Sequence, residues 1–147
     1  MTAVLYRPGE GERLEAGGSA IVLKATGEQT AGSFFLSETT LAPGFPGPPL
    51  HRHETLHDMF YILEGTLRMR LEDEEIDAEA GTFVCVPPGV AHTFSNPSPT
   101  AVRVLNFNTP SGFEHYMREL AEAMRSGPMS SEEIGRIASR HDFHAVV

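Results

Sequence analysis

Leu50-His-Arg-His-Glu-Thr-Leu-His-Asp-Met-Phe-Tyr-Ile-Leu-Glu-Gly65 places three imidazoles and a carboxylate directly before an apolar run. That run, Met59 to Leu63, has the length and composition of a buried β-strand. Because successive side chains of a strand alternate between its two faces, His51 and His53 point the same way. Two imidazoles on one face provide half of a metal site.

Short β-rich segments continue on both sides of this stretch, separated by Gly, Pro and Asn at close intervals. This spacing is typical of an all-β sandwich or barrel. The segment Pro43 to Pro49 is too rich in proline for a helix or a sheet ladder, so we expect a stiff loop leading to His51. Glu64-Gly65 predicts a tight hairpin turn. The expected strands, about ten in number, are 3–6, 20–25, 33–42, 51–53, 59–63, 66–71, 75–78, 82–86, 92–95 and 101–108.

After Pro110 the apolar period changes from two residues to that of a helix. Ser111 to Glu114 and Ser130 to Glu133 both have the spacing of a capping box, which predicts two helices. We expect these helices to lie against the outside of a barrel, with His115, His141 and His144 on the surface. The prediction is one domain over residues 1–147, with a barrel at 1–109 and a helical tail at 110–147.

Composition excludes several classes of partner. The chain carries 20 Asp and Glu against 11 Lys and Arg, which argues against binding to nucleic acid or to an anionic membrane. The one cysteine, Cys85, cannot form an internal disulfide and is expected to be a small buried hydrophobe. Without a signal peptide or a membrane-length apolar run, a cytoplasmic location is expected.

A second informative stretch runs from Gly81 to Asn96. Gly81, Pro87, Gly89, His92 and Asn96 have the spacing of the second motif of the cupin family, and the chain resembles that family. The first motif finds His51, His53 and Gly65 but has Asp58 where a Glu is usual. The resemblance implies a small antiparallel β-barrel, or jelly roll, that holds one divalent metal, with His51, His53 and His92 as ligands. Zinc is the first choice of metal, with nickel, iron or manganese as alternatives.

Two ways of aligning the first motif leave the fourth ligand open. By distance to Gly65, Asp58 takes the Glu position, although its side chain is shorter by one carbon–carbon bond, about 1.5 Å. By alternation along an unbroken strand, His57 shares the face of His51 and His53, whereas a bulge would reverse that choice. We take His57 as the fourth ligand and Asp58 as a candidate catalytic base. The third interpretation is a solvated pair at the barrel rim.

The expected walls of the site are apolar. Alternate inward positions of a barrel would bring Phe60, Ile62, Met69 and Phe94 beside the ligands, together with Leu67. An apolar pocket with one metal and few polar groups suits a small hydrophobic aromatic or polyketide substrate. Apolar residues at such positions can equally be ordinary core.

Within the cupin family, a single domain with a helical tail looks like two groups of enzymes from aromatic natural-product chemistry. One is the polyketide cyclases, in which a metal acts as a Lewis acid for aldol-type ring closure. The other is the quercetinase-like dioxygenases, which use a Glu ligand as base. The lack of that Glu favours the cyclase. A non-catalytic module that binds a small molecule is the alternative from another class. The chain is expected to be a monomer or a homodimer.

Overall fold

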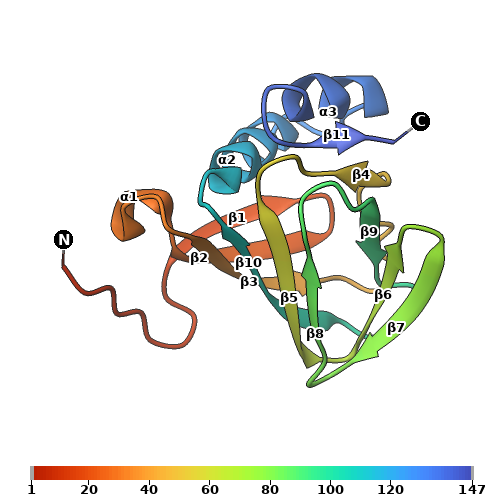
Figure 1. Cartoon of the computed structure of the whole chain (residues 1–147), viewed down its shortest axis with the longest axis horizontal. Coiled ribbons are helices and arrows are strands. Elements are labelled where there is room, and N and C mark those ends of the chain that lie inside the picture. The colour runs from red at the N-terminus through yellow and green to blue at the C-terminus, as the bar shows by residue number, and fades with distance from the viewer. Residues whose placement is uncertain (1, 147) are drawn as a thin grey trace.

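Segments with period-two patterning form two facing antiparallel sheets in the computed structural model, which describes residues 2–146 (Figure 1). The six-stranded sheet has the order β1-β2-β3-β10-β5-β8, and the five-stranded sheet has the order β11-β4-β9-β6-β7. The strands of the first sheet are β1 (Glu12–Ala16), β2 (Ser19–Ala25), β3 (Phe35–Leu41), β10 (Val102–Thr109), β5 (His57–Glu64) and β8 (Phe83–Val86). Those of the second are β11 (His144–Ala145), β4 (His51–Arg52), β9 (His92–Ser95), β6 (Thr66–Leu71) and β7 (Glu74–Glu79). The all-β prediction is confirmed.

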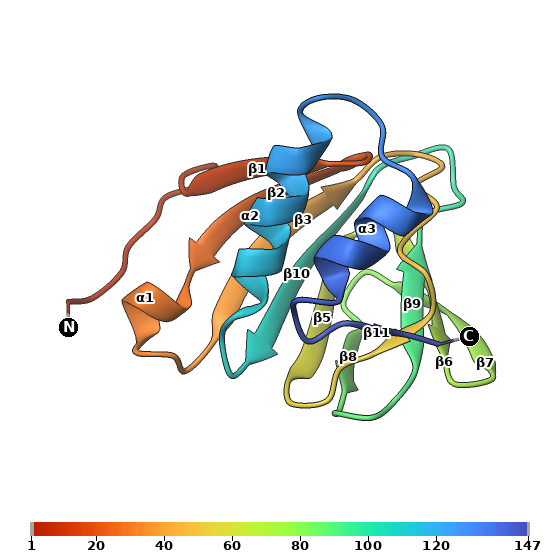
Figure 2. The same cartoon turned by 90° about the horizontal axis from the view of Figure 1, so that it is seen from above.

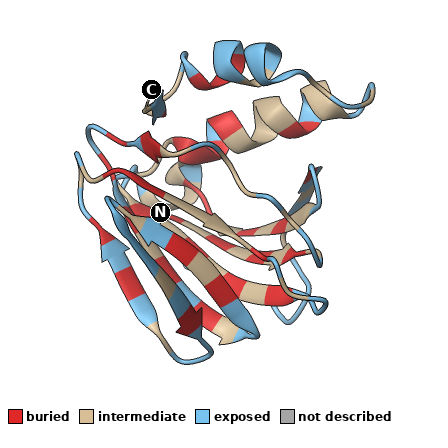
Figure 3. Ribbon diagram, turned by 90° about the vertical axis from the view of Figure 1, so that its right-hand side faces the viewer, coloured by how far each residue is buried: buried red, intermediate tan, exposed pale blue. Residues whose placement is uncertain are grey.

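One apolar core lies between the two sheets. Ile62 of β5 and Val104 of β10 are opposite each other in the register and pack with Leu67 and Met69 of β6. Buried and more exposed residues alternate along these strands (Figure 3). The pleat therefore sends one set of side chains into the sandwich and leaves the other set facing out.

A second apolar core lies under the helices α2 (Phe113–Met124) and α3 (Ser131–Ala138). Ile21 of β2 belongs to this core, and the strand register places it on the same sheet face as Ile62 through Thr39 and Val104. The helices therefore cover the inner face of β1 to β3, beside the second sheet, and the expected position outside a barrel is wrong (Figure 2). The reason is that the five-stranded sheet leaves this half of the inner face open. No helix within residues 2–146 is long and apolar enough to cross a membrane.

The two helices of the tail begin differently. Ser130 accepts a hydrogen bond from the backbone N–H of Glu133, as the second capping box predicts. The first box is wrong, because α2 begins after Gly112 without a side-chain cap. The Glu114 carboxylate instead accepts from the N–H groups of Gly112 and Gly27, and Gly27 opens the short helix α1 (Gly27–Thr30). This buried carboxylate ties the helical tail to the loop after β2.

Two predictions near the start of the chain and at Gly65 are wrong. Residues 3–6 form no strand, and the first strand is β1, whose mostly charged sequence hides its pairing with β2. Gly65 does not close a hairpin, because β5 and β6 belong to different sheets. Its positive φ of 79° turns the chain from one sheet to the other, and an added Cβ would lie 3.0 Å from Val102 Cγ2. Cys85 is exposed on the edge strand β8 and is not part of either core.

Candidate metal centre

Four buried side chains meet at the junction of the two cores. His51 of β4 pairs directly with His92 of β9, and His53 follows β4 in the turn that leads to β5. Asp58 of β5 completes the group from the opposite sheet. One ligand atom from each of the four residues lies within 4.8 Å of the others. Residues far apart in the sequence thus form one compact cluster of potential ligands.

All three imidazoles are oriented by backbone carbonyl groups. The Nδ1 atoms of His51, His53 and His92 lie at hydrogen-bonding distance from the carbonyl oxygens of Pro49, Asp142 and Val90. Since a carbonyl oxygen can only accept, each Nδ1 carries the hydrogen. The Nε2 atoms, which face the centre of the cluster, are left free to coordinate. This arrangement is typical of histidine ligands to a metal.

Asp58 supplies the negative charge. Its Oδ2 lies 2.9 Å from His92 Nε2 and 3.4 Å from His53 Nε2. Burial alone would raise the pKa of Asp58, but hydrogen bonds from His53 and His92, when these imidazoles carry a second proton on Nε2, hold that pKa well below its usual range. Burial, followed by the influence of His92, lowers the pKa of His51 to about 3, so this imidazole is neutral at pH 7.

The cluster needs a bound proton or a metal ion to offset the repulsion between its members. A carboxylate oxygen and the free Nε2 lone pairs repel one another at these distances unless a proton or a metal ion lies between them. Three imidazole nitrogens and one carboxylate oxygen are ligands that zinc and other divalent transition metals accept. The residues present therefore fit a divalent metal.

The structure separates the two candidates for the fourth ligand. His57 is exposed and lies outside the cluster, whereas the next residue, Asp58, is 5% exposed and lies inside it. The physical reason is that β4 ends at Arg52 and β5 begins at His57, so residues 53–56 form a turn and not a continuous strand. Alternation counted from His51 does not hold across that turn. The geometry therefore replaces His57 by Asp58 in the ligand set.

The residues expected to line a substrate pocket lie in or against the core between the sheets. Phe60, Ile62 and Met69 are buried there, and Phe94 is partly buried against them. Phe60 contacts both His92 and Phe94 through its ring, with centroid distances of 6.5 Å and 5.5 Å. Their contact with a substrate stays a prediction.

The same inner face also carries polar groups that the sequence pattern did not indicate. Ser37, Thr39, Asn106 and Asn108 are buried beside the apolar core. Their positions follow from strand alternation, because each faces inward on β3 or β10. The interior beside the cluster is thus more polar than expected.

The C-terminal segment covers the cluster, which the sequence did not indicate either. The Phe143 ring stacks on His51 with centroids 4.1 Å apart and planes at 13°. Phe113 meets His53 edge-on at 5.2 Å. Residues 144–145 form β11, which pairs with β4. Two residues are too few to give a strand pattern, so no sequence signal marked this contact.

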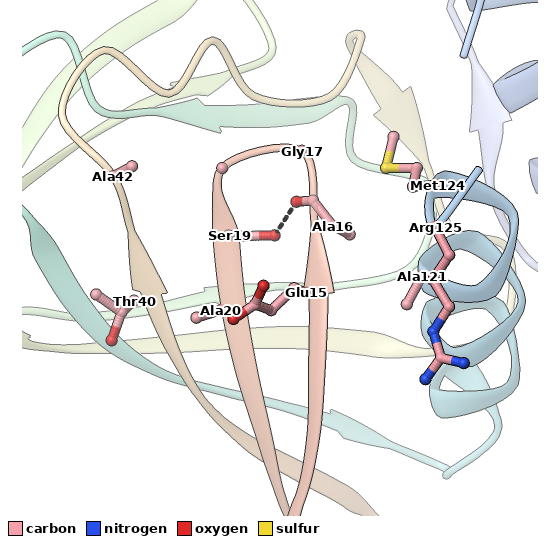
Figure 4. Close-up of a pocket in the computed structure, with 11 residues that line it drawn as sticks. Glu15, Ala16, Gly17, Ser19, Ala20, Thr40, Ala42, Ala121, Met124 and Arg125 are labelled. Atoms are coloured by element: carbon pink, nitrogen blue, oxygen red, sulfur yellow. Dashed lines mark hydrogen bonds between the residues drawn. The ribbon is translucent and has the colours of Figure 1, made fainter. Parts of the chain in front are cut away.

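The remaining histidines are not part of the cluster. His115 and His144 are exposed, as predicted, and His141 is partly buried against Glu119 with Nε2 and Oε2 at 2.8 Å. A hollow on the surface lies elsewhere, between the β1–β2 turn and the end of α2 (Figure 4). It shares no residue with the cluster.

Comparison with known proteins identifies the type of domain. The cupin domain profile matches residues 37–108. These residues form a cupin domain. The matched segment contains all four members of the cluster.

Individual relatives agree with this assignment. The chain is 27% identical over 135 residues to quercetin 2,3-dioxygenase of Bacillus subtilis, a match that covers 88% of this chain but only 39% of that protein. The structure of KdgF from Halomonas sp. overlaps with a TM-score of 0.67 at 16% identity, covering 78% of this chain and 99% of the other. The polyketide cyclase RemF of Streptomyces resistomycificus overlaps with a TM-score of 0.63 at 21% identity, covering 76% and 81%. These structural similarities show the cupin fold.

The residues of the second cupin motif have identifiable roles in this fold. Gly89, with a φ of 89°, donates its N–H to the carbonyl of His53. The Asn96 carboxamide donates to the carbonyl oxygens of Leu41, Ala42 and Thr100, and accepts from Ser98. Gly89 therefore supports the turn that carries His53, and Asn96 joins the end of β9 to the end of β3.

Proposed function

We propose that this chain is a metal-dependent enzyme that acts on a small aromatic or polyketide molecule. The observation that carries the proposal is the convergence of three imidazoles, each oriented through its Nδ1 by a backbone carbonyl, and one carboxylate in a buried site. A bound divalent metal would supply a Lewis acid for an oxygen atom of the substrate. The protein would orient the ligands and exclude water, since His51, His53 and His92 are each at most 2% exposed.

The reaction favoured first is oxidative cleavage of a flavonol-type ring by dioxygen. Asp58 lies where a carboxylate ligand is needed, a position that the sequence alignment left in doubt, and this weakens the main reason for preferring a cyclase. The similarity to quercetin 2,3-dioxygenase extends over 88% of this chain and supports the same choice. In this reaction both atoms of O₂ enter the products, a depside and carbon monoxide.

Polyketide cyclisation is the second candidate, and one observation favours it. Asp58 Oδ1 accepts from Asn106 and Asn108, and the pKa of Asp58 is lowered, so this carboxylate is a poor acceptor for a substrate proton. Chemistry in which the metal polarises a ketone, without Asp58 as the base, is compatible with that state. Holding a flexible chain with its reacting carbons together would supply much of the rate.

Metal content of purified variants tests the centre itself. We expect Asp58→Ala to lose most of the bound metal, because it removes the one charged ligand of a buried site. His57→Ala is the matched control, since it removes an exposed side chain one residue away, and it should keep the metal content of the wild type. Inductively coupled plasma mass spectrometry gives the metal-to-protein ratio and names the ion. Loss of metal in His57→Ala with retention in Asp58→Ala would contradict the assignment.

Product analysis then separates the two reactions. The metal-loaded protein is incubated with quercetin under oxygen, and carbon monoxide and the depside are measured. Their appearance supports the dioxygenase, and their absence together with ring closure of a poly-β-ketone supports the cyclase. A protein that cannot be reconstituted with any divalent metal would remove both reactions and leave a non-catalytic binding module.

A further inference from the structure

We infer that Asn106 and Asn108 are positioning residues that hold Asp58 as a one-oxygen metal ligand. The inference rests on the proposed metal centre and assigns two residues that lie outside its ligand set. Both belong to β10, the neighbour of β5 in the six-stranded sheet. Asn108 is opposite Asp58 in the strand register, and Asn106 is two residues away on the same face.

The two carboxamides converge on a single oxygen atom. The Nδ2 atoms of Asn106 and Asn108 each lie 2.8 Å from Asp58 Oδ1. The other oxygen, Oδ2, faces His53 and His92. Oδ1 of the carboxylate thus accepts the amide hydrogen bonds, and Oδ2 faces the proposed metal position. Hydrogen bonds to a charged acceptor are about twice as strong as neutral ones, so this orientation is firmly held.

In this orientation the amide oxygen of Asn108 is left without a hydrogen bond. Its Oδ1 is buried and has no hydrogen-bond partner within residues 2–146, and the residue is 1% exposed. An unsatisfied buried acceptor destabilises the folded state. Turning the amide by 180° would leave Asn108 Nδ2 without an acceptor and place Asn108 Oδ1 against the Asp58 carboxylate. The repulsion between these oxygens makes that orientation less favourable than the observed one. The rotamer is therefore set by Asp58, not by packing alone.

The pattern along β10 points to the same role. Its other inward residues, Val102 and Val104, belong to the apolar core, and the change to asparagine occurs only at the two positions next to Asp58. Apolar side chains at both positions would leave Oδ1 buried without a donor. With two donors on Oδ1, a bidentate contact to the metal would require both hydrogen bonds to break. Asp58 is accordingly a one-oxygen ligand.

A double-mutant cycle on metal affinity tests the inference. The affinities of purified protein for Zn²⁺ and Co²⁺ are measured by competition with a chromophoric chelator. We expect Asn108→Leu and Asn106→Leu each to lower affinity by roughly 10- to 100-fold, the usual effect of removing a partner of a metal ligand. In an Asp58→Asn background the same changes should have less than about a twofold effect, because no carboxylate remains to be held.

The control variant is Ser37→Ala, which also removes a buried polar group from this sheet face; its hydroxyl bonds to Thr39 and to the backbone carbonyl of Asn106, and not to Asp58 or to the Asn106 carboxamide. It should keep wild-type affinity and the wild-type visible spectrum with Co²⁺, whereas Asn108→Leu should alter that spectrum because Asp58 can turn. If a leucine variant does not fold, Asn108→Ser and Asn106→Ser remove the same hydrogen bonds with a shorter polar side chain.

Two outcomes would overturn the inference and differ from each other. In the first, the wild type binds metal, and the asparagine variants either bind it equally well or lose as much affinity in the Asp58→Asn background as in the wild-type background. The asparagines are then structural, and the metal centre stands. If the wild type binds neither ion, the metal centre fails and the inference fails with it.

Discussion

Asp142 links the C-terminal segment to the turn that carries His53. Its carboxylate accepts from the backbone N–H groups of Glu54, Thr55 and Leu56 and from the Thr55 hydroxyl. Its own carbonyl oxygen accepts from His53 Nδ1. One residue therefore fixes both the turn and the tautomer of a ligand. Burial acts to raise the pKa of Asp142, but the hydrogen bonds from Glu54 and Thr55 outweigh it and lower the pKa to about 2.

We predict that Asp142 contributes to the acid dependence of stability. A lowered pKa means that the contribution is complete above about pH 4 and is lost as the pH falls toward 2. Its size is roughly 1 kcal/mol, because the side chain is partly screened by solvent. Urea unfolding of the chelator-treated protein between pH 6 and 2.5 should show a flatter acid slope for Asp142→Asn. The control, Asp73→Asn, alters an exposed turn residue and should follow the wild type. Equal slopes for all three proteins would contradict the prediction.

At the residue scale, the sequence located three of the four members of the cluster. His51, His53 and His92 come from two motifs with fixed spacing, so they were predictable before the structure. The choice between His57 and Asp58 was not, because it depends on where β4 ends and β5 begins. The roles of Asn106, Asn108 and Asp142 depend on strand register and on a distant segment, which no local pattern encodes.

Among the elements, the proline-rich loop between β3 and β4 has the most direct effect on the site. It is hydrogen-bonded along β9, through Phe45 to the Asn96 N–H and through Pro48 to the Thr93 hydroxyl. Its last carbonyl, at Pro49, orients His51. The sequence predicted a stiff loop leading to His51, and the structure confirms its place. Close packing of this loop on β9 depends on Gly47.

We predict a large difference between two glycine substitutions in this loop. Both Gly44 and Gly47 have positive φ, at 76° and 81°, so alanine at either position costs roughly 1–2 kcal/mol of stability. A Cβ on Gly44 meets nothing within 4 Å, but a Cβ on Gly47 would lie 1.8 Å from the carbonyl oxygen of Phe94. Gly47→Ala should therefore cost at least about 2 kcal/mol more, because backbone must move. Urea unfolding midpoints measure both, and similar losses would contradict the close packing.

The elements also show which parts of a fold a sequence encodes locally. The boundaries of β6 and β9 were predicted as they are, because each has alternating residues between clear turn signals. The sequence predicts a hairpin at Gly65 wrongly, since a Glu-Gly pair between two strands does not reveal whether those strands share a sheet. The position of α2 and α3 on the inner face depends on how much of that face the second sheet covers, which is a property of the assembled fold.

At the scale of the whole molecule, the cluster joins parts that have separate cores. His92 contacts Phe60 of the core between the sheets, and His53 contacts Phe113 of the core under the helices. The potential ligands come from β4, the turn after it and β9 on one side and from β5 of the other sheet. A metal ion bound to all four would therefore link both sheets at the boundary of the two cores. Such a link exists only in the folded chain.

Metal binding should accordingly raise the thermal stability of the entire protein. An ion that binds the native state alone stabilises it by about 2.7 kcal/mol when its free concentration is 100 times Kd. For a chain of this size that corresponds to a rise in Tm of roughly 5–10 °C. Differential scanning calorimetry with Zn²⁺ and then with excess chelator should show the rise and its reversal. His92→Ala should lose the rise, and His115→Ala, on the exposed side of α2, should keep it. An ion bound in the cluster needs the His92 imidazole, whereas an ion bound to the acidic surface does not. A rise that persists in His92→Ala would therefore place the stabilising ion on the acidic surface and not in the cluster.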